Sequence, residues 1–283
     1  MDSSKKDVFI QLLSICTLLF ISVIFLSNTQ IPQNVSPTGA FVTIPTPTPF
    51  NPFPYNPPQI PNSRSYLTML VGDSMVGSLG PNAQLLRLHL IELYKDHEFV
   101  NYNYGFGATS IETLPDRLTK DSLYEGQNYP AILSQGFNLI IIESFGYNPL
   151  SQLKDGEGLA KHMRILDESI KQIIKARPES VVAIMAPIAP NKENFAKGVY
   201  DLSPEERIKW TDERTSYIES VIKYAKENEI PLINVYEKSL TTQGTGDLKY
   251  INSDDHIHPS TEGVDLISRT IAEFIFNNKI FPE

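Results

Sequence analysis

From residue 65 onward, the chain alternates between short apolar runs of the kind found in β-strands and longer segments with the apolar spacing of α-helices. The strand-like runs are residues 66–71, 98–104, 137–145, 180–187 and 231–236. The helix-like segments are residues 83–95, 111–118, 159–176, 204–228 and 260–277. Because parallel strands need crossover connections, this alternation predicts an α/β fold: a three-layer α/β/α sandwich around a five-stranded parallel sheet.

The N-terminal segment 8–26 (VFIQLLSICTLLFISVIFL) is apolar and carries no charge. A helix of that length, at about 1.5 Å per residue, can cross a hydrocarbon core of about 30 Å. Lys5 and Lys6 precede it, so the positive-inside rule places residues 1–7 in the cytoplasm and the remainder outside. A cleaved signal peptide is the alternative, but the segment exceeds the usual apolar core and Ser27-Asn28-Thr29-Gln30 offers no small-x-small cleavage site. We therefore expect an uncleaved single-span anchor.

A proline-rich stretch follows this apolar segment, and ten of the 21 prolines lie between residues 31 and 61. Proline fixes φ and removes backbone donors, so the stretch neither continues a helix nor pairs within a sheet. We expect residues 27–61 to form an extended linker and residues 62–283 to form the folded domain.

Charge and cysteine content restrict the class of protein. The formal net charge is −9, and all of it belongs to residues 62–283, because Asp2, Lys5, Lys6 and Asp7 cancel. An acidic domain does not favour nucleic acid, which is bound through clustered Lys and Arg. The single cysteine, Cys16, lies in the apolar segment, so the domain has no disulfide and no thiol nucleophile. The sequence does not indicate an oligomeric state.

Segments with catalytic residue types follow four of the predicted strands. They are Gly72-Asp73-Ser74, residues 103–109 (NYGFGAT), Gly146-Tyr147-Asn148 and residues 255–258 (DHIH). Ligands of open parallel sheets bind outside the carboxyl ends of the strands, so these segments are expected to form one site. Serine needs a base to take its proton and a carboxylate to orient that base. Ser74, His258 and Asp255 are therefore the candidate nucleophile, base and acid.

These segments resemble the sequence blocks of the SGNH (GDSL-like) hydrolase family over about residues 66–277. The resemblance implies a flavodoxin-like sheet and an acyl-enzyme formed on Ser74, with His258 and Asp255 completing the triad. It also implies that the backbone N–H groups of Ser74 and Gly107 and the side chain of Asn148 stabilise the oxyanion.

The sequence departs from the family pattern in two places. Pro149 stands where the family commonly has aspartate after the asparagine, which removes the hydrogen bonds of that aspartate. The glycine block is one residue tighter than usual, so either Gly107 or Gly105 is a candidate donor, and an ungapped alignment places Ala108 there. We favour Gly107, because Gly107-Ala108-Thr109 matches the small-residue-then-threonine ending of the block.

The expected function is that of a membrane-anchored, extracytoplasmic serine esterase removing an acyl group, often acetyl, from a carbohydrate or lipid-like ester. The alternatives are an acyltransferase to a cell-surface glycan and a non-catalytic glycan-binding or scaffold module. No cofactor or metal is expected, because Asp254, His256 and His258 lack a further distant ligand. The loops 189–203 and 240–253 are expected to line the substrate pocket.

Overall fold

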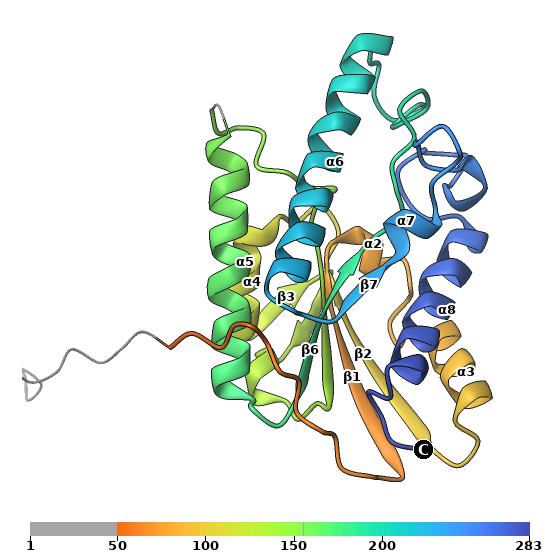
Figure 1. Cartoon of the computed structure of the whole chain (residues 1–283). Helices are drawn as coiled ribbons and strands as arrows, with labels where there is room; N and C mark the ends of the chain where they lie inside the picture. The colour runs from red at the N-terminus through yellow and green to blue at the C-terminus, as the bar shows by residue number, and fades with distance from the viewer. Residues whose placement is uncertain (1–49, 155) are drawn as a thin grey trace, which may run out of the picture. The chain divides into compact units, whose positions relative to one another are not determined.

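A computed structural model of the chain describes residues 50–154 and 156–283 (Figure 1). The expected membrane span 8–26 lies outside these residues. Within the described part of the chain, no helix combines the length and apolar character needed to cross a bilayer.

The central sheet contains five strands, β1 (Ser65–Gly72), β2 (Glu98–Gly105), β5 (Leu139–Glu143), β6 (Val181–Ala186) and β7 (Leu232–Asn234). Their spatial order is β2-β1-β5-β6-β7, and every pair is parallel. The first strand along the chain thus lies beside the second and third, which is the flavodoxin-like order. This confirms the expected five-stranded parallel sheet.

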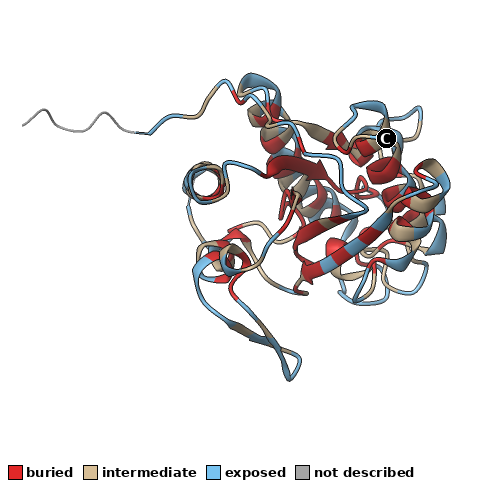
Figure 2. Ribbon diagram, turned by 90° about the horizontal axis from the view of Figure 1, so that it is seen from below, coloured by how far each residue is buried: buried red, intermediate tan, exposed pale blue. Residues whose placement is uncertain are grey.

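Helices cover both faces of the sheet (Figure 1). One face is covered by α3 (Gln84–Leu93) and α8 (Thr261–Asn277), and the other by α4 (Leu114–Thr119), α5 (Glu157–Ala176) and α6 (Pro204–Glu227). Alternate side chains of β1 serve the two layers: Leu70 packs in the α3–α8 core, whereas Met69 and Val71 pack in the other core. Both cores are buried against the sheet (Figure 2), which confirms the three-layer sandwich.

The register of the strands aligns their carboxyl ends. Gly72 of β1 pairs with Gly105 of β2, and Val71 pairs with Ile142 of β5. The segments that follow β1, β2 and β5 therefore emerge at one edge of the sheet.

Several short elements connect the main ones. They are the helices α2 (Ser74–Gly77) and α7 (Val235–Lys238) and the 3-10 turns Ile111–Thr113, Ile132–Ser134 and Leu248–Tyr250. A small antiparallel hairpin, β3 (Ser122–Tyr124) and β4 (Gln127–Tyr129), was not anticipated from the sequence. Its two-residue turn has positive φ at both Glu125 (49°) and Gly126 (77°), as a type I′ turn requires.

Part of the expected linker belongs to the folded domain, which includes residues 50–61 as well as residues 62–283. Tyr55 is 5% exposed, its N–H donates to Asn228 O at 2.8 Å, and its hydroxyl accepts the Val182 N–H at 3.0 Å. The ring of Phe53 packs edge-on against Tyr224, and Ile60 is buried. The proline content correctly excludes a helix or strand here, but the interleaved aromatic residues anchor the segment to the domain.

Candidate active site

Ser74 lies at the junction where β1 turns into α2. Asp73 caps this short helix, because its Oδ1 accepts the N–H of Met75 at 2.8 Å. The turn requires glycine at position 72: a Cβ there would lie 2.5 Å from Cγ2 of Val76 and 2.7 Å from Cβ of Glu143. Ser74 is the first residue of α2, so its own N–H has no acceptor within the helix.

Asp255 holds the ring of His258 through a compact loop. Its Oδ1 accepts the backbone N–H groups of Ile257 at 2.8 Å and His258 at 3.0 Å, and its Oδ2 lies 2.8 Å from Nδ1 of His258. Partial burial acts to raise the pKa of Asp255, but these hydrogen bonds outweigh it and hold the pKa below its ordinary value. Because an ionised carboxylate only accepts, Nδ1 carries a proton and Nε2 is the basic nitrogen of the neutral ring.

The loops expected to line the pocket support this acid–base segment instead. Asn252 N–H donates to His258 O at 2.8 Å, and Ala196 N–H donates to His256 O at 3.3 Å. His256 adopts a φ of 53°, and its Nδ1 lies 3.2 Å from Lys197 O. Among the residues that the structure describes, no three His, Cys, Asp or Glu side chains converge as a metal site.

Ser74 and His258 line one cavity of about 400 Å³. The rest of its wall comes from the turn after α2, the end of β2 and the β3–β4 hairpin, namely Gly77, Ser78, Gly80, Pro81, Asn103, Gly105, Gly107, Tyr124, Glu125 and Tyr129. The loops 189–203 and 240–253, which were expected to line the substrate pocket, contribute nothing to this wall. In the described part of the chain, the side chains of Ser74 and His258 line the same cavity but do not form a direct hydrogen bond. In enzymes without bound substrate, the bond between nucleophile and base is often too long to count as one.

The two glycines proposed as oxyanion donors are both hydrogen-bonded. The Gly105 N–H donates to Oδ1 of Asn103 at 2.8 Å, and a Cβ on Gly105 would lie 2.2 Å from the Gly77 nitrogen. Gly105 is thus a packing position against α2. The Gly107 N–H donates to the hydroxyl of Tyr124 at 2.8 Å.

Asn148 is linked to the nucleophile turn by a hydrogen bond to Asp73. Its Nδ2 donates to Oδ2 of Asp73 at 2.9 Å, which uses one of its two amide hydrogens. Asn148 is not among the residues that line the cavity of Ser74 and His258. The backbone N–H of Asn148 donates to Phe145 O at 3.2 Å and fixes the turn that precedes Pro149.

A pair of fully buried carboxyl groups lies beneath Ser74. Oε2 of Glu143 accepts the Asp73 N–H at 3.4 Å, and Oε1 accepts the Ser144 hydroxyl at 2.8 Å. Burial, and then the nearby Asp73 charge, raise the pKa of Glu143 well above its ordinary value. Burial also raises the pKa of Asp73, but Met75, Asn148 and a nearby arginine oppose it. We infer that Glu143 is protonated and Asp73 carries the negative charge.

Arg117 of α4 is the cation that faces this pair. It is buried and donates to Gly72 O at 2.8 Å and to Tyr104 O at 3.0 Å, which ties the ends of β1 and β2 together. Its guanidinium also donates to the Thr109 hydroxyl and lies 4.2 Å from the ring centroid of Phe106. Burial lowers the pKa of Arg117 to about 10, so the side chain stays charged at neutral pH.

Replacing Glu143 by glutamine is expected to change how stability depends on pH. A carboxyl group whose pKa is raised in the folded protein makes the fold less stable as the pH rises above the group's pKa in the unfolded chain, about 4.3. The free energy of unfolding then falls by at most about 1.4 kcal/mol per pH unit. Glutamine does not titrate, so Glu143→Gln should not show this loss. Between pH 4 and pH 7, its free energy of unfolding should therefore rise relative to that of the unmodified protein. Urea unfolding at several pH values measures this difference. Glu205→Gln, at an exposed position, is the control, and parallel pH profiles for Glu143→Gln and the unmodified protein would contradict the assignment.

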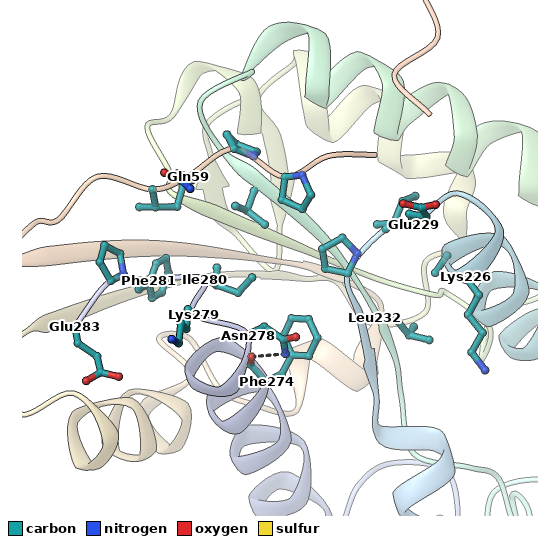
Figure 3. A pocket seen from close by; sticks show the side chains of 18 residues that line it. Gln59, Lys226, Glu229, Leu232, Phe274, Asn278, Lys279, Ile280, Phe281 and Glu283 are labelled. Atoms are coloured by element: carbon teal, nitrogen blue, oxygen red, sulfur yellow. Dashed lines mark hydrogen bonds between the residues drawn. The ribbon is translucent and has the colours of Figure 1, made fainter. Parts of the chain in front are cut away.

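A larger cavity, of about 1030 Å³, lies at the other end of the sheet (Figure 3). Its lining includes the first residues of β6 and β7, Val181 and Leu232, together with Phe274, Ile280 and Phe281 near the C-terminus. None of the candidate catalytic residues lies there. The smaller cavity, at the carboxyl edge of the sheet, is therefore the candidate active site.

No family model and no curated protein matches the chain. Solved structures do match. A lipase/acylhydrolase from Enterococcus faecalis is 17% identical and has a TM-score of 0.53, over 75% of this chain and 96% of that one. A GDSL-like lipase from Bacteroides thetaiotaomicron is 15% identical with a TM-score of 0.51, over 75% and 89%. An acetylxylan esterase from Geobacillus stearothermophilus is 14% identical with a TM-score of 0.51, over 77% and 96%. The domain therefore has the fold of the GDSL-like lipases and esterases, as the sequence blocks implied.

Proposed function

We propose that this protein is a serine esterase that removes a short acyl group from a carbohydrate or lipid-like ester through an acyl-enzyme. One observation carries the proposal. Ser74 at the end of β1 lines the same cavity as His258, whose Nδ1 is hydrogen-bonded to Asp255 at 2.8 Å. A hydroxyl, an imidazole with a free basic nitrogen and an orienting carboxylate are the groups that acyl transfer needs.

The reaction follows from these groups. As Oγ of Ser74 bonds to the acyl carbon, Nε2 of His258 takes the serine proton and the carbonyl π electrons move to oxygen. The imidazolium then protonates the leaving alcohol, and the C–O ester bond breaks. Water, activated by the same nitrogen, releases the acid. Asp255 stabilises the imidazolium, while the Ser74 N–H and the Asn148 amide, which also bonds to Asp73, would stabilise the oxyanion.

The cavity favours a short acyl group. About 400 Å³ is at the small end of ligand sites, and its wall carries Asn103, Glu125 and two tyrosines rather than an aliphatic tunnel. The acetylxylan esterase among the structures of similar fold acts on an acetylated polysaccharide, as its name states. We therefore favour an acetyl ester on a carbohydrate over a long-chain lipid.

The proposed location is the outer side of a cell membrane. It rests on the uncharged segment 8–26 and the lysines that precede it. Residues 27–49, which follow, would hold the esterase domain clear of the bilayer.

A fluorophosphonate probe that does not cross membranes tests both proposals in one experiment. Cells with an intact cytoplasmic membrane are treated with the probe, and labelling is expected on Ser74 within the tryptic peptide 65–87. The purified full-length chain should also release acetate from p-nitrophenyl acetate and from acetylated xylo-oligosaccharides.

Two matched variants define the result. Ser74→Ala should remove both labelling and turnover, whereas Ser65→Ala, in the same peptide but exposed at the other end of β1, should retain them. If the unmodified protein turned over the ester no faster than Ser74→Ala, the non-catalytic glycan-binding alternative would be favoured. Labelling that appears only after lysis would overturn the outward orientation.

A further inference from the structure

The N–H of Gly107 has a partner inside the cavity, the hydroxyl of Tyr124, at 2.8 Å. A Cβ built on Gly107 would lie 3.0 Å from this hydroxyl and 3.8 Å from Cβ of Ser74. The tyrosine hydroxyl and the nucleophile thus approach the same face of Gly107. An N–H has a single hydrogen, and that of Gly107 is already used.

The β3–β4 hairpin that carries Tyr124 is fixed to the domain. The ring of Tyr124 stacks on Phe106 with centroids 4.5 Å apart and planes 10° apart. On the second strand, the ring of Tyr129 packs edge-on against Phe106 and Tyr104, at 4.8 and 5.2 Å.

Two hydrogen bonds close the base of the hairpin. The Ala131 N–H donates to Oδ1 of Asp121 at 2.9 Å, and the Tyr104 hydroxyl donates to Pro130 O at 2.9 Å. A hydrogen-bond donor for a developing charge should already be in place before the reaction. A hydroxyl anchored in this way meets that requirement.

We propose that the Tyr124 hydroxyl, held by the Gly107 N–H, donates the hydrogen bond to the oxyanion that Gly107 itself was expected to supply. The inference rests on the proposed esterase function. When Ser74 bonds to the acyl carbon and the carbonyl becomes an alkoxide, the Tyr124 O–H donates to that oxygen without transferring its proton. The Gly107 N–H polarises the hydroxyl from behind, because hydrogen bonds in a chain strengthen one another.

The chemistry of Tyr124 fits a neutral donor. Its hydroxyl oxygen accepts from Gly107, so its own hydrogen goes to a second partner; the Glu125 carboxylate is one such acceptor, which the oxyanion would replace. Burial and the adjacent Glu125 carboxylate raise the pKa of Tyr124, although the Gly107 N–H opposes them, so the phenol keeps its proton at neutral pH. The shortened glycine block of the sequence and the hairpin tyrosine then have one explanation: the tyrosine hydroxyl donates in place of the Gly107 N–H that it occupies.

Tyr124→Phe tests this assignment, because phenylalanine keeps the stack on Phe106 and removes only the hydroxyl. With p-nitrophenyl acetate and the full-length chain, kcat should fall about 10²-fold while KM changes less than about twofold. Fluorophosphonate labelling of Ser74 should slow by a similar factor, since its phosphoryl oxygen takes the same position. Tyr102→Phe is the control: Tyr102 is an exposed tyrosine of β2 that does not line this cavity, so both rates should stay within about twofold.

Each outcome decides a separate question. Rates for Tyr124→Phe equal to those of Tyr102→Phe would overturn the inference and leave the esterase function standing. Faster rates would show that the hydroxyl blocks the Gly107 N–H, which overturns it as well. An unmodified protein that neither hydrolyses the ester nor takes up the probe would overturn the esterase function itself. Thermal unfolding by circular dichroism separates a lost donor from a disordered hairpin.

Discussion

The double variant Ser74→Ala/His258→Ala is expected to hydrolyse p-nitrophenyl acetate no more slowly than either single variant, each about 10⁶-fold below the unmodified protein in kcat. The reason is that the two side chains act in one step. A serine without its base keeps its proton, and a base without its serine has no proton to take. Losses that instead multiplied to about 10¹² would mean that the residues act in separate steps. Initial rates for the four proteins complete the mutant cycle.

The structure supplies a control for this cycle. His256 lies two residues from His258, and its Nδ1 bonds to Lys197 O rather than to a carboxylate. His256→Ala should therefore retain kcat within a few-fold. An equal loss in His256→Ala and His258→Ala would show that the loop is merely being disrupted, and the assignment of His258 as the base would then fail.

The sequence was sufficient to predict the sheet. The apolar runs that become β5 and β6 are wholly buried, and continuous apolar runs are typical of parallel strands covered on both faces. Helix boundaries were also predictable where capping was strong: α6 starts at Pro204, after Ser203 accepts the Glu206 N–H in a capping box. The nucleophile segment followed from its position directly after the first strand.

The parts that were missed depend on tertiary contacts. The β3–β4 hairpin has strands of three residues with exposed or half-buried side chains, which leave no apolar periodicity to detect. Its turn signal, Glu125-Gly126, was too weak to stand alone. Residues 50–61 were assigned to the linker because prolines dominate them, yet burial of Tyr55 and Ile60 decides where they lie.

Two charged residues that support the site were also missed, although one left a trace in the sequence. A glutamate at the end of a strand as apolar as residues 139–143 is costly to bury unless it is neutralised or paired. Glu143 was thus a detectable anomaly. Arg117 gave no such signal, because a single arginine in a short helix is ordinary; its role appears only when its contacts with Gly72 O and Tyr104 O are seen.

Replacing Asp255 by asparagine is expected to lower kcat about 10⁴-fold without unfolding the loop. Oδ1 of Asp255 already accepts two backbone N–H groups, so the asparagine carbonyl oxygen must take that position. Its amide nitrogen is then directed at Nδ1 of His258, where Oδ2 lies 2.8 Å away in the unmodified protein. An N–H donor at that point stabilises the tautomer with the proton on Nε2. That nitrogen can no longer accept the proton of Ser74, although every heavy atom keeps its place.

Asp254→Asn is the matched control, because Asp254 is the exposed neighbouring carboxylate in the same loop. It changes the local charge equally but leaves the tautomer of His258 untouched, so its kcat should stay within a few-fold. NMR of ¹⁵N-labelled imidazole distinguishes the two tautomers directly. A protonated Nδ1 retained in Asp255→Asn, or equal losses of kcat in the two variants, would show that Asp255 acts through loop charge rather than through the tautomer. A proton moved to Nε2 together with the large loss would instead identify the orienting hydrogen bond as the catalytic contribution of Asp255.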